Sequence, residues 1–334
     1  EAHALTEEMW EILEPTIIRN AGAEVWIVFN PRLATDFAYR RFVTNPPKGY
    51  IVRKINYDEN PYLPQSALDK IAEKRDESED DYLHIYEGIP RDNDDKSIIK
   101  RQWLMSAIDA HKKLDIDVSG ERRIGFDVAD DGEDLNAISW GHGVLCEGVE
   151  VWKGLEDELL QSATKVYNKA TELGATIDYD CIGVGAAMGA KFKELNAAKS
   201  TRVEYRKFNA GDAVVNPKSF YMPKVTNKDH FANLKAQSWQ VVADRLMKTH
   251  AWVTRGQECD PADIISLSSD ISNLELLIDE LSTPHRHYDN SGKTKVESKI
   301  DLRKRDVKSP NRADAFIMNF APVKRTKTNW GALA

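Results

Sequence analysis

The chain has 334 residues, 41% hydrophobic and 30% charged, which is enough for two domains with sizeable cores and excludes wholesale disorder. No stretch approaches the roughly 20 apolar residues of a membrane span, and no charged-then-apolar leader of a secreted protein opens the chain. The net charge of −8 alone argues against a nucleic-acid binder, but acidic and basic residues are segregated, which weakens that argument.

The first segment is predicted to hold a helix followed by short strands. Thr6 can cap a helix whose first turn carries Glu7 and Glu8, a favourable place for acids at the positive end of the helix dipole. Two apolar runs, Val25–Phe29 and Tyr50–Ile55, are typical of short strands.

A polar region then separates this segment from the rest of the chain. Residues 66–86 have a polar helical pattern, and the charged run Arg91–Lys96 has the composition of a linker. We therefore expect a domain boundary near residue 95 and a connecting helix over Ile99–Leu114.

From Arg123 onward the pattern predicts an α/β domain. Five strands are expected: Ile124–Val128, Ala137–Val144, Val149–Trp152, Thr176–Asp180 and Val203–Phe208. The first three should form an antiparallel meander that turns near Gly148, and a helix ending before Gly174 should follow. Later helices are expected over residues 190–195, 230–249, 263–282 and 311–319, with a hairpin around Asn290–Lys293. This order of elements is that of an RNase H-like domain, although order alone is weak evidence of function.

Three acids sharpen this interpretation. Asp127 ends the first strand and Asp180 ends the fourth, and in this topology the two strands are neighbours in the middle of the sheet. Asp314 lies at the start of a late helix, where it can complete the cluster. Oxygen-only ligands suit Mg²⁺ or Mn²⁺, and two such ions about 4 Å apart can activate water and stabilise the leaving oxygen of a phosphodiester.

Each acid also has an ordinary structural explanation. Asp127 and Asp180 can form strand-end turns, and Asp314 can be a first-turn acid of its helix. For each acid taken alone, the structural explanation is better than the catalytic one. The prediction of a metal site therefore depends on all three acids having compatible places in one topology. Asp134 is a candidate for a fourth, supporting acid.

The chain resembles the large subunits of tailed-phage terminases over nearly its whole length. Asp178–Phe192 is similar to their second nuclease motif, Ile124–Ala137 to the first, and Ser309–Phe316 to the third, with Asp314 as its acid. Further similar segments are Asn233–Trp239, His285–Lys293, Glu1–His3, Val25–Pro31, Tyr57–Pro64 and Lys96–Leu104. In this resemblance Glu1 corresponds to the catalytic glutamate that ends a Walker B strand, and Asn30 to the tip of the coupling motif that follows it.

The resemblance implies an α/β RNase H-like mixed sheet with flanking helices, preceded by part of a P-loop-type ATPase and a linker. Four segments follow: 1–95 as the partial ATPase and linker, 96–117 as the connecting helix, 118–323 as the nuclease domain and 324–334 as a basic tail. Such proteins cut concatemeric viral double-stranded DNA with two divalent ions, Mg²⁺ or Mn²⁺, during ATP-driven packaging into a prohead. They work with a small terminase subunit and the portal in the host cytoplasm, with which three cysteines without a CxxC pair agree.

Two features limit or extend this expectation. No GxxxxGK[ST] loop occurs in the sequence, so this chain is not expected to hydrolyse ATP, which would bind the full-length protein only. Basic residues near Asp314 are expected to form a rim that contacts the DNA backbone: Arg303, Lys304, Arg305, Lys308 and Arg312.

Other interpretations remain open at this point. The chain can be a non-catalytic portal-docking module, or another RNase H-like enzyme such as a resolvase or transposase. The ATPase-like first segment argues against a resolvase or transposase. A test of metal binding would distinguish a portal-docking module from a nuclease. His285 and His287 share a face of an expected strand, but two histidines without a third ligand are more often structural.

Overall fold

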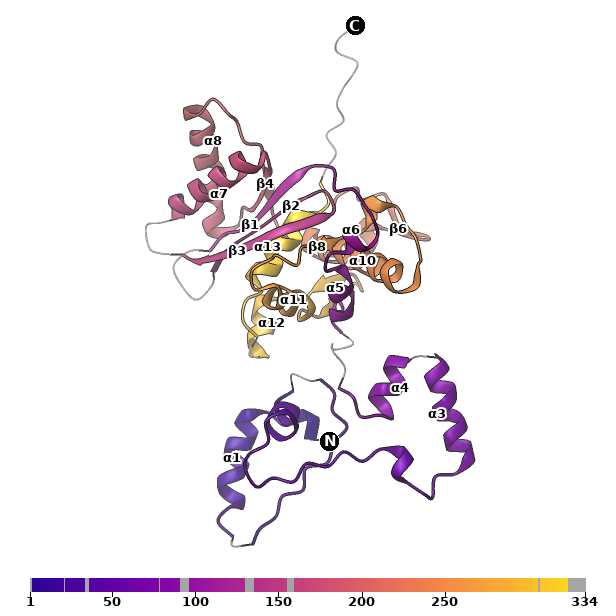
Figure 1. Ribbon diagram of the computed structural model, residues 1–334. Coiled ribbons are helices and arrows are strands. Elements are labelled where there is room, and N and C mark those ends of the chain that lie inside the picture. Colours follow the sequence, from indigo (N-terminus) through magenta and orange to yellow (C-terminus); the bar gives the residue numbers. More distant parts are fainter. Residues whose placement is uncertain are drawn as a thin grey trace. The chain divides into compact units, whose positions relative to one another are not determined.

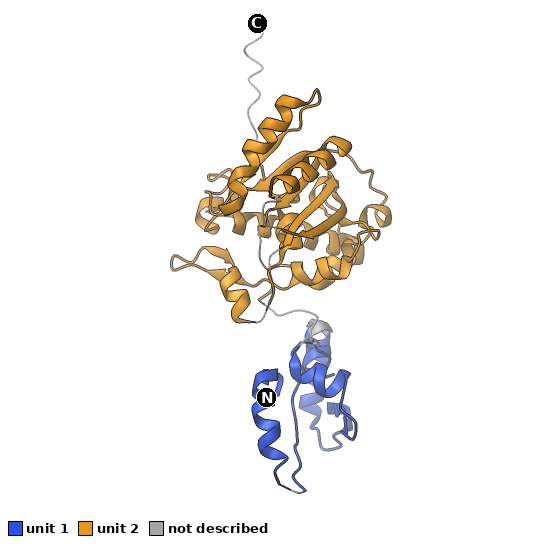
Figure 2. Ribbon diagram, turned by 90° about the vertical axis from the view of Figure 1, so that its left-hand side faces the viewer, with its two compact units in different colours: residues 1–95 blue, residues 96–334 orange. Residues whose placement is uncertain are grey.

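The computed structural model describes residues 2–20, 22–33, 36–77, 79–90, 96–129, 135–154, 159–305 and 307–323. The chain divides into two compact units, residues 1–95 and residues 96–334 (Figure 2). None of the described helices combines the length and the apolar character that crossing a membrane requires.

The first unit consists of short helices joined by irregular chain (Figure 1). Its helices are α1 (Glu7–Ile17), α2 (Phe37–Tyr39), α3 (Gln65–Glu77) and α4 (Glu79–Ile85), with a π-helical turn at Arg40–Thr44 and 3-10 turns at Ala2–Ala4 and Tyr57–Glu59. The Thr6 hydroxyl accepts a hydrogen bond from the Met9 N–H at 3.2 Å, which confirms the expected cap of α1. A small core forms where Trp10 packs edge-on against Phe42, with ring centroids 4.9 Å apart.

Neither strand expected in this unit forms. Val25–Phe29 and Tyr50–Ile55 have no strand pairing among the described residues. The side chains of Trp26 and Ile51 are 83% and 96% exposed. A strand is stable only when a neighbour takes up its backbone hydrogen bonds and covers its apolar side chains, and the described part of this unit supplies no such neighbour.

The second unit is built on one six-stranded mixed sheet. Its strands are β1 (Arg122–Asp127), β2 (Leu135–His142), β3 (Leu145–Lys153), β4 (Thr176–Asp180), β5 (Tyr205–Phe208) and β8 (Ser266–Leu267), in the order β5-β4-β1-β2-β3-β8. The first three form the predicted antiparallel meander, whereas β4 runs parallel to β1 and β5 runs parallel to β4. The RNase H-like fold is thereby confirmed, including the prediction that the first and fourth strands are neighbours.

The meander turns earlier than predicted. The turn between β2 and β3 lies at Gly143 and Val144, where Gly143 has a φ of 58°, a value that favours glycine. Gly148 instead lies inside β3, under the ring of Trp140, and a Cβ at this position would lie 2.0 Å from that ring. Gly148 therefore serves close packing, which a sequence pattern cannot distinguish from a turn.

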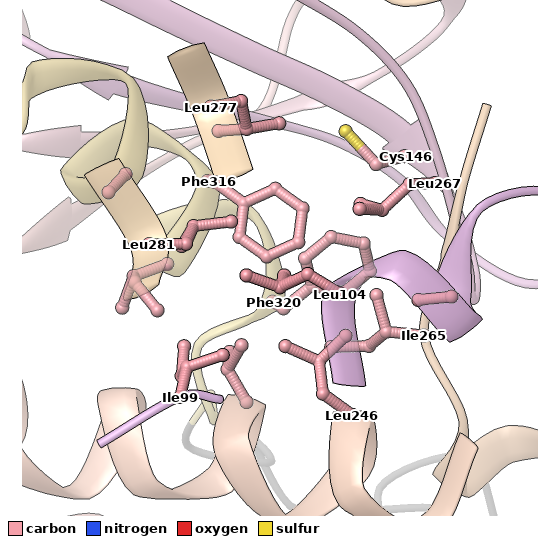
Figure 3. Close-up of a cluster of buried hydrophobic side chains, with 14 of the residues drawn as sticks. Ile99, Leu104, Cys146, Leu246, Ile265, Leu267, Leu277, Leu281, Phe316 and Phe320 are labelled. Atoms are coloured by element: carbon pink, nitrogen blue, oxygen red, sulfur yellow. The ribbon is translucent and has the colours of Figure 1, made fainter. Parts of the chain in front are cut away.

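Helices cover both faces of the sheet (Figure 1). On one face lie α7 (Leu159–Leu173) and α8 (Met188–Ala198), whose buried side chains meet those of β1 and β4. The opposite face carries α5 (Arg101–Ala107), α10 (Leu234–Arg255), α11 (Leu274–Ser282) and α13 (Asn311–Phe320). Figure 3 shows the core of this second face, where Phe316 and Phe320 of α13 lie among Leu277, Leu281 and Leu246. Helix α13 is therefore held firmly against the sheet.

The expected connecting helix is interrupted and belongs to the second unit. Helix α5 ends at Ala107 and a second helix, α6 (Ala110–Lys113), follows. Between them Ile108 forms a bridge with Leu267 of β8, and Asp109 adopts a left-handed conformation. The segment thus pairs with the edge of the sheet, which a helix continuous from 99 to 114 would prevent.

Two smaller hairpins complete the unit. One consists of β6 (Phe220–Met222) and β7 (Val225–Thr226), followed by the short helix α9 (Asn227–His230). The other, predicted from sequence, consists of β9 (Arg286–Tyr288) and β10 (Thr294–Val296) and leads into α12 (Lys299–Lys304). The helix expected over 263–282 begins only at Leu274, because the buried run Ile264–Leu267 joins the sheet edge as β8.

Candidate functional site

The carboxyl ends of β1 and β4 bring two acids together. Phe126 of β1 is in register with Tyr179 of β4, so Asp127 and Asp180, the next residues of these parallel strands, reach the same edge of the sheet. Asp127 is 5% exposed and Asp180 is partly buried. Two carboxylates with little access to water therefore lie on neighbouring strands.

A glycine-rich turn shapes the chain around Asp180. The Ile182 N–H donates to Asp180 Oδ1 at 3.0 Å, which fixes the carboxylate against the turn. Gly183 has a φ of 57°, and a Cβ on Gly185 would lie 1.9 Å from the Asp180 carbonyl oxygen. The glycines of this segment therefore allow the chain to fold back closely over the end of β4.

Asp314 reaches this edge from helix α13. It occupies the first turn of that helix, which crosses β1 so closely that a Cβ on Gly125 would lie 2.0 Å from the Ala315 carbonyl oxygen. Asp314 Oδ1 lies 3.1 Å from Lys235 Nζ at the start of α10. Asp127, Asp180 and Asp314 interact electrostatically with one another, so the structure brings the three predicted acids into one cluster.

Burial and mutual repulsion make this cluster unfavourable for three negative charges. Loss of water raises the pKa of Asp127 well above its ordinary value, and the charges of Asp314 and Asp180 raise it further. Burial is also the main cause of the raised pKa of Asp180. Lys299 and Lys235 act in the opposite direction on both groups. The ionised forms of these carboxylates are therefore disfavoured in the empty cluster, and a bound cation would stabilise them.

The donor set fits hard divalent ions. Three carboxylates offer only oxygen ligands, which is the preference of Mg²⁺, Mn²⁺ and Ca²⁺. Within the described residues the three carboxylates do not all come within 4.8 Å of one another.

Three residues of the cluster were not predicted as site residues. Lys235 and Lys299 supply its positive charge, and Asn311 contacts Asp127 directly. In the amide orientation that satisfies both its ends, the Asn311 nitrogen donates to Asp127 Oδ2 at 3.3 Å and its oxygen accepts from Leu135 N–H at 3.0 Å. Lys235 and Asn311 lie inside segments noted for their resemblance, but nothing in the sequence alone distinguishes them from surface residues.

The predicted basic rim divides into two groups. Arg312 Nη1 donates to Glu280 Oε1 at 2.6 Å, and Glu280 Oε2 accepts from the backbone N–H groups of Arg312 and Ala313. Arg305 donates to Glu297 at 2.6 Å. These two arginines are therefore engaged in ion pairs within the domain, whereas Arg303, Lys304 and Lys308 are exposed, Lys304 with a contact to Asp301.

The remaining sequence-based candidates fall outside the described residues or belong to the first unit. Asp134 and Glu1 fall outside the described residues, as does the basic tail 324–334. Asn30 belongs to the first unit, where its amide donates to the His84 carbonyl oxygen at 3.1 Å. Asn30 thus joins two distant segments of that unit.

Comparisons with known proteins agree with both parts of the chain. A family model described as phage terminase large subunit matches residues 1–89. The solved nuclease domain of the large terminase subunit gp2 of bacterial virus Sf6 is 31% identical, with a TM-score of 0.63 over 68% of this chain and 99% of that one. A variant of that domain, solved with manganese and beta-thujaplicinol, is 30% identical with a TM-score of 0.64 and the same coverage. A variant solved with calcium is 29% identical with a TM-score of 0.63, over 68% of this chain and 100% of that one. A search of curated proteins gave no match.

Proposed function

Because the chain belongs to the large subunits of phage terminases, we propose that residues 118–323 cut double-stranded viral DNA by a two-metal-ion mechanism. The observation that carries this proposal is the convergence of Asp127, Asp180 and Asp314 from two neighbouring parallel strands and the crossing helix α13. The substrate is concatemeric DNA, cut as genomes are packaged.

Each side chain of the cluster has a distinct part in this proposal. Asp127, which is buried and contacts Asn311, would hold the ions together with Asp180 and Asp314. When bound, the ions supply Lewis acidity toward the phosphate and lower the pKa of a coordinated water. Lys235 balances the charge of Asp314 before metal arrives. Mn²⁺ and Ca²⁺ in the Sf6 domain support this choice of metals.

The proposal extends to the other segments and to the partners. Residues 1–95 are the later part of an ATPase domain with its linker, residues 96–117 are the first segment of the nuclease unit, and 324–334 form a basic tail. ATP is a ligand of the full-length protein, in which Glu1 and Asn30 take part in hydrolysis and coupling. The small terminase subunit and the portal are the expected partners, in the host cytoplasm. The family match over residues 1–89 supports this arrangement.

Metal dependence tests the proposal directly. Supercoiled plasmid incubated with the chain and Mn²⁺ or Mg²⁺ should be nicked and linearised. Excess EDTA should stop the reaction, because the proposed mechanism needs a divalent ion to activate water and stabilise the leaving oxygen. Cleavage that persists in EDTA would contradict the metal mechanism. Absence of both cleavage and Mn²⁺ binding would instead favour the alternative of a portal-docking module.

The exposed bases of the rim are expected to contact the DNA backbone. Replacing Arg303, Lys304 or Lys308 by Ala should weaken binding for all sequences and reduce the slope of log K against log salt by about 0.9 for each phosphate that is no longer neutralised. Binding is measured in EDTA at several salt concentrations, so that no cleavage occurs. Lys113→Ala is the matched control, because α6 packs beside β8 at the far edge of the sheet.

Replacement of Arg312 tests the division of the predicted basic rim into ion-paired and exposed bases. Because its guanidinium is held by Glu280, Arg312→Ala should lower the melting temperature and leave the salt slope nearly unchanged. A slope reduced by Arg312→Ala but not by the three exposed bases would reverse this assignment of the rim.

A further inference from the structure

The β9–β10 hairpin brings three potential metal ligands together: His285, His287 and Glu297. One ligand atom from each lies within 4.8 Å of the other two. No other trio of histidine, cysteine or carboxylate ligands in the described parts of the chain is as close. The third ligand that the sequence left unassigned for the two histidines is therefore supplied by the opposite strand.

The strand register explains why these side chains meet. His287 is paired with Lys295 and Arg286 with Val296, so the next pair along the hairpin joins His285 to Glu297. The Glu297 N–H donates to the His285 carbonyl oxygen at 3.0 Å. Directly opposite residues and residues two apart on one strand share a face of the sheet, which places all three ligands on the same face.

The site is held in shape before any ion arrives. Glu297 is 3% exposed, and its Oε2 accepts from the His285 backbone N–H at 3.0 Å and from Arg305 Nη1 at 2.6 Å. His285 Nδ1 lies 3.9 Å from the same oxygen. Ligands about 2.0–2.1 Å from a tetrahedral ion are roughly 3.4 Å apart, so only a small side-chain movement separates this geometry from coordination.

We propose that His285, His287 and Glu297 bind one Zn²⁺ ion at a site separate from the acid cluster. Two imidazoles and one carboxylate are a zinc ligand set with a fourth position open for water, whereas Mg²⁺ prefers oxygen alone. The Glu297 carboxylate would hold the ion while Arg305 and the His285 N–H donate to its Oε2, an outer-shell arrangement that fixes the ligand. The ion fastens β9 to β10 directly before α12, which carries Lys299.

Two charges near the site have to be accommodated. Arg305 already neutralises Glu297, so this pair alone can account for the buried carboxylate without any metal. Lys295 is paired with His287, and its side chain is exposed to solvent, which screens its charge.

The experiment is a zinc titration of the untagged full chain against a chromogenic chelator, with millimolar Mg²⁺ present to occupy the acid cluster. One Zn²⁺ per chain is expected. His287→Ala, chosen because His287 is exposed and its loss should not disturb the core, should weaken binding on the order of 100-fold. His84→Ala, a histidine of the first unit, is the matched control and should bind zinc as the wild type does.

A second readout excludes a purely structural role of the hairpin. Zinc should raise the melting temperature of the wild-type chain and of His84→Ala but not that of His287→Ala, because a ligand that binds only the folded state stabilises it. Unchanged zinc affinity in His287→Ala would overturn the proposal, as would zinc binding abolished by Asp127→Asn alone. Cleavage with Mg²⁺ should persist in His287→Ala, so failure of the zinc site leaves the proposed nuclease untouched.

Discussion

Asp127→Asn is expected to reduce metal-dependent DNA cleavage by on the order of 10³-fold and, in EDTA, to raise the melting temperature. The loss of activity follows because the metal ions contribute several kcal/mol to the transition state, and each 1.36 kcal/mol is tenfold in rate. The gain in stability follows because Asn removes a buried charge that Asp314 and Asp180 repel. Each kcal/mol of relieved repulsion should raise the melting temperature by roughly 2–4 °C.

The stability gain has a definite pH dependence. The pKa of Asp127 is raised in the folded chain by burial and by its acidic neighbours. Above that folded-state pKa the carboxylate is ionised in both the folded and the unfolded state. Burial and repulsion of the ionised group then destabilise the folded state in full. Below the ordinary pKa of an unfolded aspartate the group is protonated in both states, so this destabilisation of the folded state disappears. The difference in melting temperature between Asp127→Asn and the wild type should therefore be largest above the folded-state pKa of Asp127 and shrink on acidification.

Asp178→Asn is the matched control, a second buried aspartate on the same sheet with the opposite expectation. Asp178 Oδ2 accepts from Arg123 Nε at 2.8 Å, and Oδ1 accepts from Arg206 Nε at 2.8 Å. Breaking such a buried pair costs about 3–5 kcal/mol, so the melting temperature should fall. If Asp178→Asn removed cleavage without lowering stability while Asp180→Asn retained activity, the second acid of the cluster would be wrongly assigned.

Gly125→Ala is expected to be the most destabilising single-methyl change in the sheet and to separate the acids. A Cβ on Gly125 would lie 2.0 Å from the Ala315 carbonyl oxygen and 2.6 Å from the Asn319 nitrogen, both backbone atoms of α13. Overpacking typically costs about 1–3 kcal/mol, and backbone neighbours cannot move aside as side chains do, so about 3 kcal/mol or more is expected. Because α13 carries Asp314, cleavage should fall with stability.

Thermal unfolding and cleavage rates check this prediction. Gly211→Ala is the control, because a Cβ there would meet only the Asn209 side chain, at 3.4 Å. It should change neither quantity appreciably. A Gly125→Ala chain with wild-type melting temperature and activity would show that α13 does not need its close approach to β1.

The local sequence pattern was sufficient to predict the strands that carry Asp127 and Asp180. The alternating and continuous apolar residues of β1 and β4 determined where these strands end, and hence that Asp127 and Asp180 lie at strand ends. The β9–β10 hairpin was predicted from turn residues between two short strands, and its register was not. These features depend on neighbours in the chain, whose geometry the backbone restricts to a few choices.

Whatever depends on distant partners was decided by the tertiary structure. The apolar run Val25–Phe29 has the composition of a strand, but no strand lies beside it among the described residues. The strand predicted there therefore does not form. The sequence predicted Arg312 as a DNA contact but did not indicate that Glu280, 32 residues earlier, pairs with its guanidinium. Lys235 and Asn311 entered the acid cluster only because α10 and α13 pack against the sheet. A charge or an amide takes its role from the groups that surround it in space, and no local spacing specifies those groups.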